Sequence, residues 1–439
     1  MNNHTIQSNS QLPLVPAPID IWIGADWADQ AHVLAICTRS GATRTCSLEQ
    51  KPELLDQFFL GLRQEHPQSR IGVCIEQTRG ALIYALMKYD FLVIYSINPR
   101  SLADFRRAFC VSGAKSDPSD AQLLCEMGCK HQERLRPLQA EDACTRKLRL
   151  LVEARRSFVD RNTSVLNEFG AVLKCYYPLM IELFEGNLDS QMACDLLKRW
   201  PHLAALKQAK PATLRAFCYA HNCRGKQRIE QRLEAIAKAV PLTEDPAIVE
   251  PLQLQALALA ELLCVLAKQI KSYDERIQRV FNEHSEAWLF RELPGAGLVI
   301  APRLAALFGT QRANWPNALD LLCRTGVAPV QKQSGNQCLV QFRWARPKFL
   351  HQTVVEFAKC SLRFCPWAKL LYEDQLAKGK SRFSAIRMVA FKWIRILWRC
   401  WTQRVAYHET TYLLGLQRRG VKLYQSLYGN PAGEPVNNP

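Results

Sequence analysis

Two short apolar runs near the N-terminus each end in a carboxylate, and this pattern restricts the fold more than any other feature. The first run, IDIWIGAD, alternates from Ile21 to Ala25 and ends at Asp26. The second, IGVCI at 71–75, is followed by Glu76. Alternation predicts a half-buried strand, and a continuous apolar run predicts a buried one. We therefore expect two strands whose ends present acidic side chains.

Further candidate strands extend this pattern through the first third of the chain. Beside 21–25 and 71–75, strands are expected at 33–37 and 91–97, with WADQA turning a hairpin between the first pair. Longer helical stretches separate the later strands, a spacing typical of α/β domains. An α/β domain is therefore predicted over 19–135, preceded by a polar segment, 1–18, that is expected to be disordered.

Two further acids lie in the segment KSDPSDAQLLCEMG. Asp117 and Asp120 are spaced i, i+3, which places both carboxylates on one helical face. A structural role is the alternative, because Pro118 suits a first helical position and makes Asp117 a good N-cap, while Asp120 would favour the helix dipole. Taken singly, each acid fits a structural role better, but the four together favour a metal site.

The chemistry of such a site follows from its ligands. Carboxylate oxygens are the ligands that Mg²⁺ prefers. Two Mg²⁺ ions about 3.5–4 Å apart can activate the attacking oxygen and stabilise the leaving oxygen of a phosphodiester. The ordered acids therefore predict metal-dependent phosphodiester chemistry with two Mg²⁺ ions as cofactors.

Charge and size point to an anionic polymer as the partner. The 439 residues carry a formal charge of +17, and clustered Lys and Arg gain affinity by releasing counterions from nucleic acid. A membrane is not expected, because the apolar stretch at 252–267 is interrupted by Gln and Glu. The 17 cysteines form no regular framework and are expected to be thiols in a reducing cytosol.

A helical region is predicted over 136–286. Apolar residues recur every seven positions from Leu151 to Leu166, and a second long helix is expected at about 248–284. Such a repeat suits a short coiled coil in which the two helices pair into a stalk, although an ordinary amphipathic core helix gives the same pattern. Its interspersed basic residues suit a nucleic-acid contact: Arg155, Arg156 and Arg161.

The C-terminal region, 287–425, carries the remaining nucleic-acid candidates. ELPGAGLVIAPRLAALFG is typical of a helix-hairpin-helix element, where Gly295 and Gly297 would let backbone N–H groups approach a phosphate; a plain interhelical turn fits equally well. From 376 to 420 there are ten Lys or Arg residues against one acid, with tryptophans interleaved. This density favours a phosphate-tracking face over simple packing. The tail, 426–439, is expected to be disordered. Further basic candidates are Lys115, Lys332, Lys380, Arg387, Lys392, Arg395 and Arg399.

Several motifs, in order, resemble one known family over nearly the whole chain. IGADWADQAH is similar to an opening G-x-D strand, IEQTRGALIYAL to an E-x-T-G segment, and INPRSLADFRRAFCVSGAKSDPSDAQLL to an N-P…K-x-D-x-x-D-A block. With TGVAPVQKQSGN and KGKSRFSAIRMVAFKWIRILW, they resemble bacterial insertion-sequence transposases with a DEDD motif. That family is related to the pilin-gene invertase and is understood as bridge-RNA-guided recombinases. Arg79 interrupts the T-G motif, and RWARPKFL stands where a K-x-G-N-x-x-L-R-like sequence is expected.

The resemblance implies a fold and a reaction. It implies an RNase H/RuvC-like N-terminal domain, a helical coiled-coil insertion and a mostly α C-terminal transposase domain. Asp26, Glu76, Asp117 and Asp120 match the metal-binding tetrad, and Q-S-G places a nucleophilic serine at Ser334. The implied reaction is recombination through a phosphoserine link, with Lys332 or another basic residue assisting.

The resemblance also implies partners. These are donor and target DNA, a noncoding bridge RNA, and a homodimer that assembles into a tetramer in which the serine of one subunit completes the metal site of another. The expected location is the bacterial cytoplasm, in association with the nucleoid. Two other functions remain as alternatives. A structure-selective nuclease would need the four acids but not Ser334, and a noncatalytic scaffold would need neither.

Overall fold

The computed structural model describes residues 19–38, 41–109 and 115–420. It divides into two compact units, residues 1–140 and 141–439. The two segments predicted to be disordered, 1–18 and 426–439, lie outside the described residues. Each unit is described by itself.

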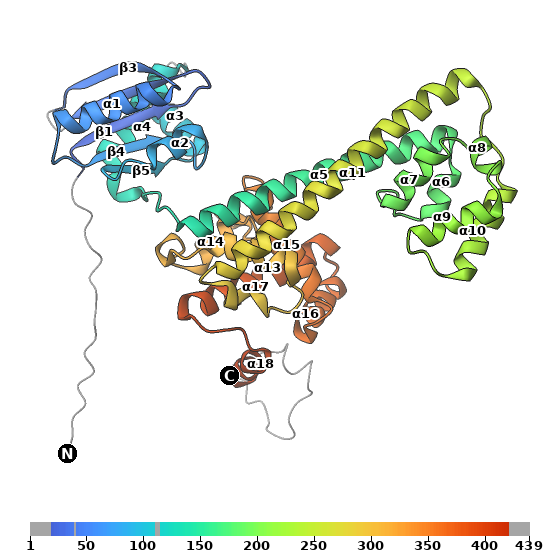
Figure 1. The fold of residues 1–439 in the computed structure, drawn as a ribbon. Helices are drawn as coiled ribbons and strands as arrows, with labels where there is room; N and C mark the ends of the chain where they lie inside the picture. Colours follow the sequence, from blue (N-terminus) through green and yellow to red (C-terminus); the bar gives the residue numbers. More distant parts are fainter. Residues whose placement is uncertain (1–18, 39–40, 110–114, 421–439) are drawn as a thin grey trace, which may run out of the picture. The chain divides into compact units, whose positions relative to one another are not determined.

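The first unit is built on a five-stranded mixed sheet with the order β3-β2-β1-β4-β5 (Figure 1). β1 is parallel to β4 and antiparallel to β2, and β5 is parallel to β4. The predicted α/β domain is therefore present, and its sheet is mixed. The strands are β1 (Ile21–Asp26), β2 (Ala31–Thr38), β3 (Thr43–Glu49), β4 (Ile71–Ile75) and β5 (Leu92–Ser96).

β3 was not predicted from the sequence. It pairs with β2 at one edge of the sheet, and only Leu48 among its side chains is buried. An edge strand that buries so little has no regular apolar alternation, which is the signal used to recognise strands. The hairpin between β1 and β2 is as expected, since Asp26 pairs with Val33.

Helices cover both faces of this sheet. Ile21, Ile23 and Ala25 of β1 pack in one core with α1 and α2. The alternate residue Trp22 packs in the other core, against α3 and α4. Because side chains alternate along a strand, Gly24 and Asp26 share the α4 face with Trp22. The helices are α1 (Pro52–Glu65), α2 (Ala81–Leu86), α3 (Pro99–Phe109), α4 (Asp117–His131) and the 3₁₀ helix η1 (Gln132–Arg134).

Gly24 permits α4 to lie directly on β1. A Cβ atom at this position would come within 2.0 Å of the Ala121 carbonyl oxygen and 2.4 Å of the Cys125 nitrogen. Both atoms belong to the backbone, so neither can move without displacing the helix. This close approach brings the first turn of α4 to the strand that ends in Asp26.

We expect Gly24→Ala to destabilise the first unit by about 3 kcal/mol or more, because the added methyl group overpacks a backbone contact. Gly61→Ala is the matched control. Gly61 lies within α1 with open space around its Cα, so alanine should stabilise the helix by roughly 0.5–1 kcal/mol. Urea unfolding of both variants measures the difference. Equal stability of Gly24→Ala and wild type would contradict the packing of α4 on β1.

The second unit is organised around two long antiparallel helices, α5 (Ala143–Tyr176) and α11 (Pro246–Glu283). Figure 1 shows them side by side. Midway along the pair, the Phe158 and Tyr273 rings lie 5.3 Å apart. One core forms where α5 begins and α11 ends, and another where α5 ends and α11 begins. The pair therefore links two helical cores.

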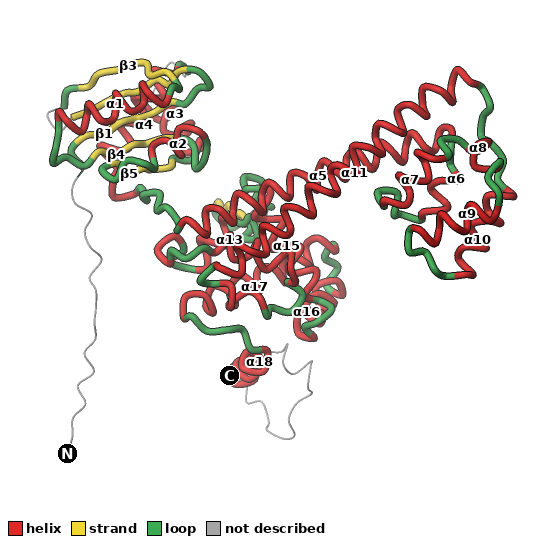
Figure 2. The backbone as a smooth tube through the Cα atoms, in the orientation of Figure 1, coloured by secondary structure: helices red, strands yellow, loops and turns green. Residues whose placement is uncertain are grey.

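The remaining elements of the second unit divide between these two cores. Outside the first unit, the described strands are confined to the hairpin β6–β7 (Figure 2). The core at the end of α5 contains α6 (Leu179–Phe184), α7 (Gln191–Arg199), α8 (Leu203–Lys207), α9 (Pro211–Ala220) and α10 (Lys226–Lys238). The other part contains α12 (Ala287–Arg291), α13 (Gly297–Phe308), η2 (Arg312–Asn314), α14 (Ala318–Arg324), β6 (Val330–Ser334), β7 (Gln337–Gln341), α15 (Lys348–Ser361), α16 (Pro366–Ala377), α17 (Arg382–Gln403) and α18 (Glu409–Arg418).

By length and composition, α11 is the one helix in the described part of the chain that could cross a membrane. A single helix of this kind is weak evidence, because core helices of soluble proteins pass the same test. The beginning of α11 contributes buried residues to one core, and its end contributes buried residues to the other.

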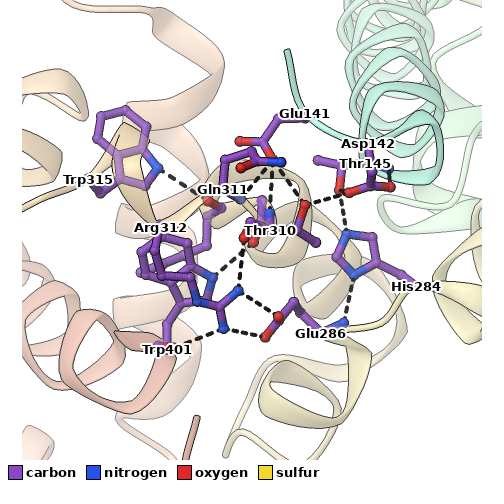
Figure 3. Close-up of polar contacts among 12 residues, drawn as sticks. Glu141, Asp142, Thr145, His284, Glu286, Thr310, Gln311, Arg312, Trp315 and Trp401 are labelled. Atoms are coloured by element: carbon purple, nitrogen blue, oxygen red, sulfur yellow. Dashed lines mark hydrogen bonds and ion pairs between the residues drawn. The ribbon is translucent and has the colours of Figure 1, made fainter. Parts of the chain in front are cut away.

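A polar network fastens the beginning of α5 to the C-terminal helices (Figure 3). Glu141 is buried and accepts hydrogen bonds from the Thr310 and Gln311 backbone nitrogens at 2.9 and 3.2 Å. Asp142 caps α5 by accepting from the Thr145 nitrogen at 2.9 Å, and it also accepts from the Thr310 hydroxyl at 2.6 Å. A buried hydrogen-bonded network of this kind can specify one arrangement of a core.

The neighbouring ion pair completes the network. Arg312 donates to both carboxylate oxygens of Glu286, at 2.6 and 2.8 Å, and to the Trp401 carbonyl oxygen at 3.0 Å. A bidentate pair of this kind fixes orientation as well as distance. The segment before α12, the η2 turn and the end of α17 are thereby held together.

Asp142 makes the stability of this unit dependent on pH. Burial alone raises the pKa of Asp142, but hydrogen bonds from Thr145 and Thr310 outweigh it and lower the pKa to about 2. A folded-state pKa below the unfolded value stabilises the protein above the unfolded pKa, and this contribution is lost as pH falls towards 2. We expect Asp142→Asn, which keeps an N-cap, to remove about 1–2 kcal/mol of the stability lost between pH 5 and 2.

Urea midpoints measured across this pH range for wild type, Asp142→Asn and the exposed-site control Glu250→Gln test the assignment. The control should follow the wild-type curve. If the urea midpoint of Asp142→Asn fell with pH as steeply as that of the wild type, Asp142 would not be the group that causes the loss of stability.

Candidate catalytic site

The two predicted strand-end acids occupy one face of the sheet. Asp26 is the last residue of β1, and Glu76 follows β4 directly. The odd-numbered residues of both strands face α1, so the even positions Asp26 and Glu76 fall on the α4 face. Because β1 and β4 are adjacent and parallel, their ends meet at the same edge of the sheet.

The first turn of α4 brings the other two acids to the face of the sheet that α4 covers. The residue that caps α4 is not Asp117. As the structural alternative to a metal role, Asp117 was considered as the N-cap before Pro118. The N-cap is instead Ser116, whose hydroxyl accepts from the Ser119 nitrogen at 3.4 Å while Ser119 reciprocates. The capping role is therefore filled, and Asp117 is left with an exposed carboxylate in the first turn.

Asp120 is buried and paired, unlike Asp117. It is 3% exposed, and the Nε of Arg106, from α3, donates to its Oδ1 at 2.9 Å. Sequence reasoning missed Arg106, since nothing in its spacing marks it as a partner of Asp120. A buried carboxylate needs such a partner, because an unpaired buried charge is costly.

The electrostatics of the four acids show that they share one environment. Burial raises the pKa of Asp26 to about 6, and the charges of Asp117, Asp120 and Glu76 add to this effect while Lys115 opposes it. Burial and the charge of Asp120 likewise raise the pKa of Glu76, against Lys115 and Arg106. Burial is thus the larger cause of both shifts, and the neighbouring carboxylates add to it.

The donor chemistry of this cluster fits a divalent cation. All four side chains offer carboxylate oxygens, the ligands that Mg²⁺ prefers, and a cation would relieve the repulsion that raises the Asp26 pKa. Among the described residues, however, no three His, Cys, Asp or Glu side chains form a ready ligand set. Asp120 is directed to Arg106 instead. The positive charge of Lys115, a residue predicted to contact nucleic acid, acts on this cluster by lowering the pKa of Asp26.

Ser334 lies in the second unit, at the turn of the hairpin β6–β7. It is the last residue of β6, is exposed, and pairs with Gln337 across the Gly335–Asn336 turn. Gly335 has a φ of +54°, as the first turn residue of a type II′ hairpin requires. Lys332 lies two positions before Ser334, so both side chains occur on the same face of the hairpin.

The predicted nucleic-acid residues of α5 are partly engaged within the protein. Arg155 donates to Asp274 at 3.1 Å. Arg156 lies 2.7 Å from Asp160 and 3.3 Å from Glu356. Arg161, in contrast, is exposed. The structure therefore gives the first two arginines a role in holding α5 to its neighbours.

The two predicted phosphate-binding glycines differ. At Gly295, with a φ of +82°, a Cβ atom would lie 2.8 Å from the Cys360 carbonyl carbon of α15. Packing alone thus requires glycine here. Gly297 has open space around it and is exposed at the start of α13.

Two of the three tryptophans of α17 are not part of a surface, and the third, Trp398, is partly buried. Trp393 and Trp401 are 1% exposed, and their indole nitrogens donate to Ser361 Oγ at 2.8 Å and the Gly309 carbonyl oxygen at 2.9 Å. The interpretation of these rings as part of a phosphate-tracking face is therefore wrong for both, because they fill the core instead.

The basic residues predicted alongside these tryptophans occupy varied environments. Arg395 and Arg399 are exposed. Burial lowers the pKa of Lys392 and of Arg387. Lys380 donates to Gln375. Lys380 is also exposed, whereas Lys392 and Arg387 are partly buried.

Two comparisons with known families cover more than half of the chain. A family model for DEDD transposases of IS110 elements, described as transposase, matches residues 23–178. A second model, described as the transposase IS116/IS110/IS902 family, matches residues 287–373. The first match includes the four acids, and the second includes Ser334.

Individual relatives agree with these matches. The IS117 mini-circle protein of Streptomyces coelicolor is 26% identical over 403 residues, covering 89% of this chain and 96% of its own length. The IS900 42 kDa protein of Mycobacterium paratuberculosis is 24% identical over 68% of this chain and 74% of its own. The fold and the matches define a DEDD-type transposase. The chain belongs to the IS110 family of insertion-sequence transposases.

The mixed sheet of the first unit and the helical second unit are consistent with a DEDD, RuvC-like transposase. This family is typically metal-dependent.

Proposed function

We propose that this transposase cuts and rejoins DNA strands through the Ser334 hydroxyl, with divalent metal ions at Asp26, Glu76, Asp117 and Asp120. The observation that carries the proposal is the convergence of these acids. Asp26 and Glu76 end adjacent parallel strands, and α4 packs its acidic first turn on the same face. Burial, with the added repulsion of the other three acids, raises the pKa of Asp26 to about 6.

Each acid has a distinct share in this proposal. Asp26 and Glu76 are fixed by the sheet, so their positions are set by the fold. Asp117 is free of the cap and exposed, and Asp120 would exchange Arg106 for a metal ion. Two Mg²⁺ ions held there would supply stabilisation of the charge that develops on the phosphate oxygens.

The covalent step centres on Ser334. Its Oγ gives up its proton to water and forms a bond to a DNA phosphorus. The bond from that phosphorus to the oxygen of the neighbouring nucleotide breaks, and this leaving oxygen takes up a proton to become a hydroxyl. A strand hydroxyl then attacks the phosphoserine and releases Ser334, so the bond energy is kept. A free serine hydroxyl is a weak nucleophile, and the positive charge of Lys332 on the same hairpin face supports its deprotonation.

Three regions of the chain have different roles in this function. Residues 19–135 form the RuvC-like catalytic domain, 136–286 the coiled-coil region, and 287–425 the C-terminal transposase domain with a helix-hairpin-helix-like element at α12–α13. Contacts with nucleic acid are made by Arg161, Gly297, Arg395 and Arg399, and their exposure supports this role. The protein acts in the bacterial cytoplasm at the nucleoid.

We also propose how the subunits assemble and how an RNA selects the DNA. Dimers form a tetramer in which Ser334 of one subunit completes the metal site of another, and a noncoding bridge RNA pairs with donor and target DNA. Exposed apolar side chains on one stripe of α11, Leu254, Leu262 and Val265, support contact with a second copy. The formal charge of +17 supports binding to two nucleic acids.

A strand-exchange assay tests this function. Purified protein, Mg²⁺, the RNA transcribed from beside the element, and labelled donor and target duplexes are combined, and each component is left out in turn. Joined donor–target products that need all of them are expected. Cut ends that are never joined, formed without the RNA, would instead identify a structure-selective nuclease. No change in the DNA under any condition would favour a noncatalytic scaffold.

A further inference from the structure

A cluster of aromatic and arginine side chains lies at the base of the β6–β7 hairpin, and we call it the Trp344 cluster: Phe342, Trp344, Arg346 and Arg387. Phe342 follows β7 directly. The Arg346 and Arg387 guanidinium carbons lie 4.1 and 4.4 Å from the centroid of its ring. The Trp344 ring packs edge-to-face against Phe342, with centroids 4.9 Å apart.

Trp344 is exposed although its neighbours are packed. Its exposed fraction is 81%, whereas that of Trp393 and Trp401 is 1%. An indole that is left in water forgoes the apolar burial that large aromatic side chains usually contribute. Phe383, 82% exposed, lies one helical turn before Arg387 on the same face of α17. Two exposed rings thus flank a stacked core of arginine and phenylalanine.

The cluster carries positive charge without a compensating acid. Burial lowers the pKa of Arg346, and the charge of Arg387 lowers it further. Burial also lowers the pKa of Arg387. No carboxylate contributes to either group within the described residues. Cations held beside an exposed ring without a counterion suit an anionic ligand.

The support beneath Trp344 is fixed. Arg346 donates to the Arg343 carbonyl oxygen at 2.8 Å and packs where Gly326 lacks a side chain, since a Cβ there would lie 2.0 Å from Arg346 Cδ. Arg343 Nε in turn donates to the Ala328 carbonyl oxygen at 3.3 Å. The platform is therefore positioned before any ligand arrives, which lowers the entropic cost of binding.

We propose that Trp344 stacks on an unpaired base of the DNA strand that Ser334 cuts, while Arg346 and Arg387 attract its phosphates. This inference rests on the proposed function for its choice of strand. Exposed aromatic rings beside a basic surface are the usual means of binding single-stranded nucleic acid.

The hairpin sets the position of that base. Ser334 pairs with Gln337, and Phe342 follows Gln341 at the other end of β7. Four residues of strand at about 3.4 Å each place the base of the hairpin roughly 14 Å from Ser334. At about 3.4 Å per nucleotide along a stacked strand, the captured base lies on the order of four nucleotides from the cut. The shared hairpin favours DNA over RNA as the ligand.

Binding of short single-stranded DNA to the full-length protein, in EDTA so that no cutting occurs, tests the inference. Base stacking on an aromatic ring is sequence-tolerant, so a labelled oligothymidine is a suitable probe. Trp344→Ala should weaken binding about tenfold, while Trp344→Phe should retain most of the affinity. Trp288→Ala, which removes another exposed tryptophan, should bind as wild type does.

A second readout separates stacking from a general structural effect. Oligonucleotides bearing one abasic position, moved along the strand beside a fixed duplex end, should bind wild type weakly at one position only. Trp344→Ala should lose that position dependence and keep the wild-type slope of affinity against salt, because stacking releases no counterions. Wild-type affinity of Trp344→Ala, or tighter Trp344-dependent binding of RNA of the same sequence, would overturn the inference. Because no metal or cutting is involved, these outcomes are independent of catalysis.

Discussion

Asp117→Asn and Asp26→Asn are expected to lower the rate of DNA cleavage by at least about a thousandfold while the protein remains folded. Loss of a metal ligand removes several kcal/mol of transition-state stabilisation, and each 1.36 kcal/mol corresponds to a tenfold change in rate. Asp117 is the more informative site, because Ser116 caps α4 and the exposed Asp117 carboxylate is not needed there. Asp26 lies at the end of β1, where its charge is opposed by the other three acids.

The matched control is Asp29→Asn, which removes an exposed carboxylate from the turn after β1. It should cleave at the wild-type rate. Thermal unfolding with and without Mg²⁺ gives a second measurement: the ion should stabilise wild type and Asp29→Asn but not Asp26→Asn. Full activity of both Asp117→Asn and Asp26→Asn would leave the acids with structural roles only.

Ser334→Ala should abolish both the covalent protein–DNA link and strand exchange, with a loss of about a thousandfold or more, since the attacking oxygen is removed. Its side chain is exposed at a hairpin turn, so the fold should be unaffected. Ser334→Cys keeps a nucleophile and should form a link at a reduced rate. Denaturing gels with end-labelled DNA measure both products.

Gln331→Ala serves as the control for this hairpin. Gln331 is exposed on β6, and its register with Val340 places it on the opposite face from Ser334. It should form the link normally. Cut but unlinked DNA produced by Ser334→Ala would contradict the serine assignment and favour a metal nuclease.

The sheet of the first unit follows from local sequence patterns. The runs that end at Asp26 and Glu76 are β1 and β4, because alternating or continuous apolar residues are what a sheet buries. β3 escaped prediction because it is an exposed edge strand. The approach of the first turn of α4 to Asp26 depends on Gly24, and glycine within a strand is itself a signal of a close backbone approach.

Other features depend on contacts that a single sequence does not reveal. The pairing of Arg106 with Asp120 joins two helices through burial, not through a spacing rule. Ser116 displaced Asp117 as the cap because a serine pair completes a reciprocal hydrogen-bonded box. Trp393 and Trp401 point inwards because α17 has core on one side and charge on the other. The role of Ser334 rests on resemblance, since Ser-Gly is an ordinary turn pair.

The most direct test of the composite site is to isolate the protein–DNA adduct and map the linked residue by mass spectrometry. Wild type incubated with Mg²⁺, RNA and cognate DNA should yield a nucleotide-bearing peptide modified at Ser334, and Asp26→Asn should yield none. Cleaved DNA without any adduct, or an adduct on a residue other than Ser334, would contradict the proposed mechanism.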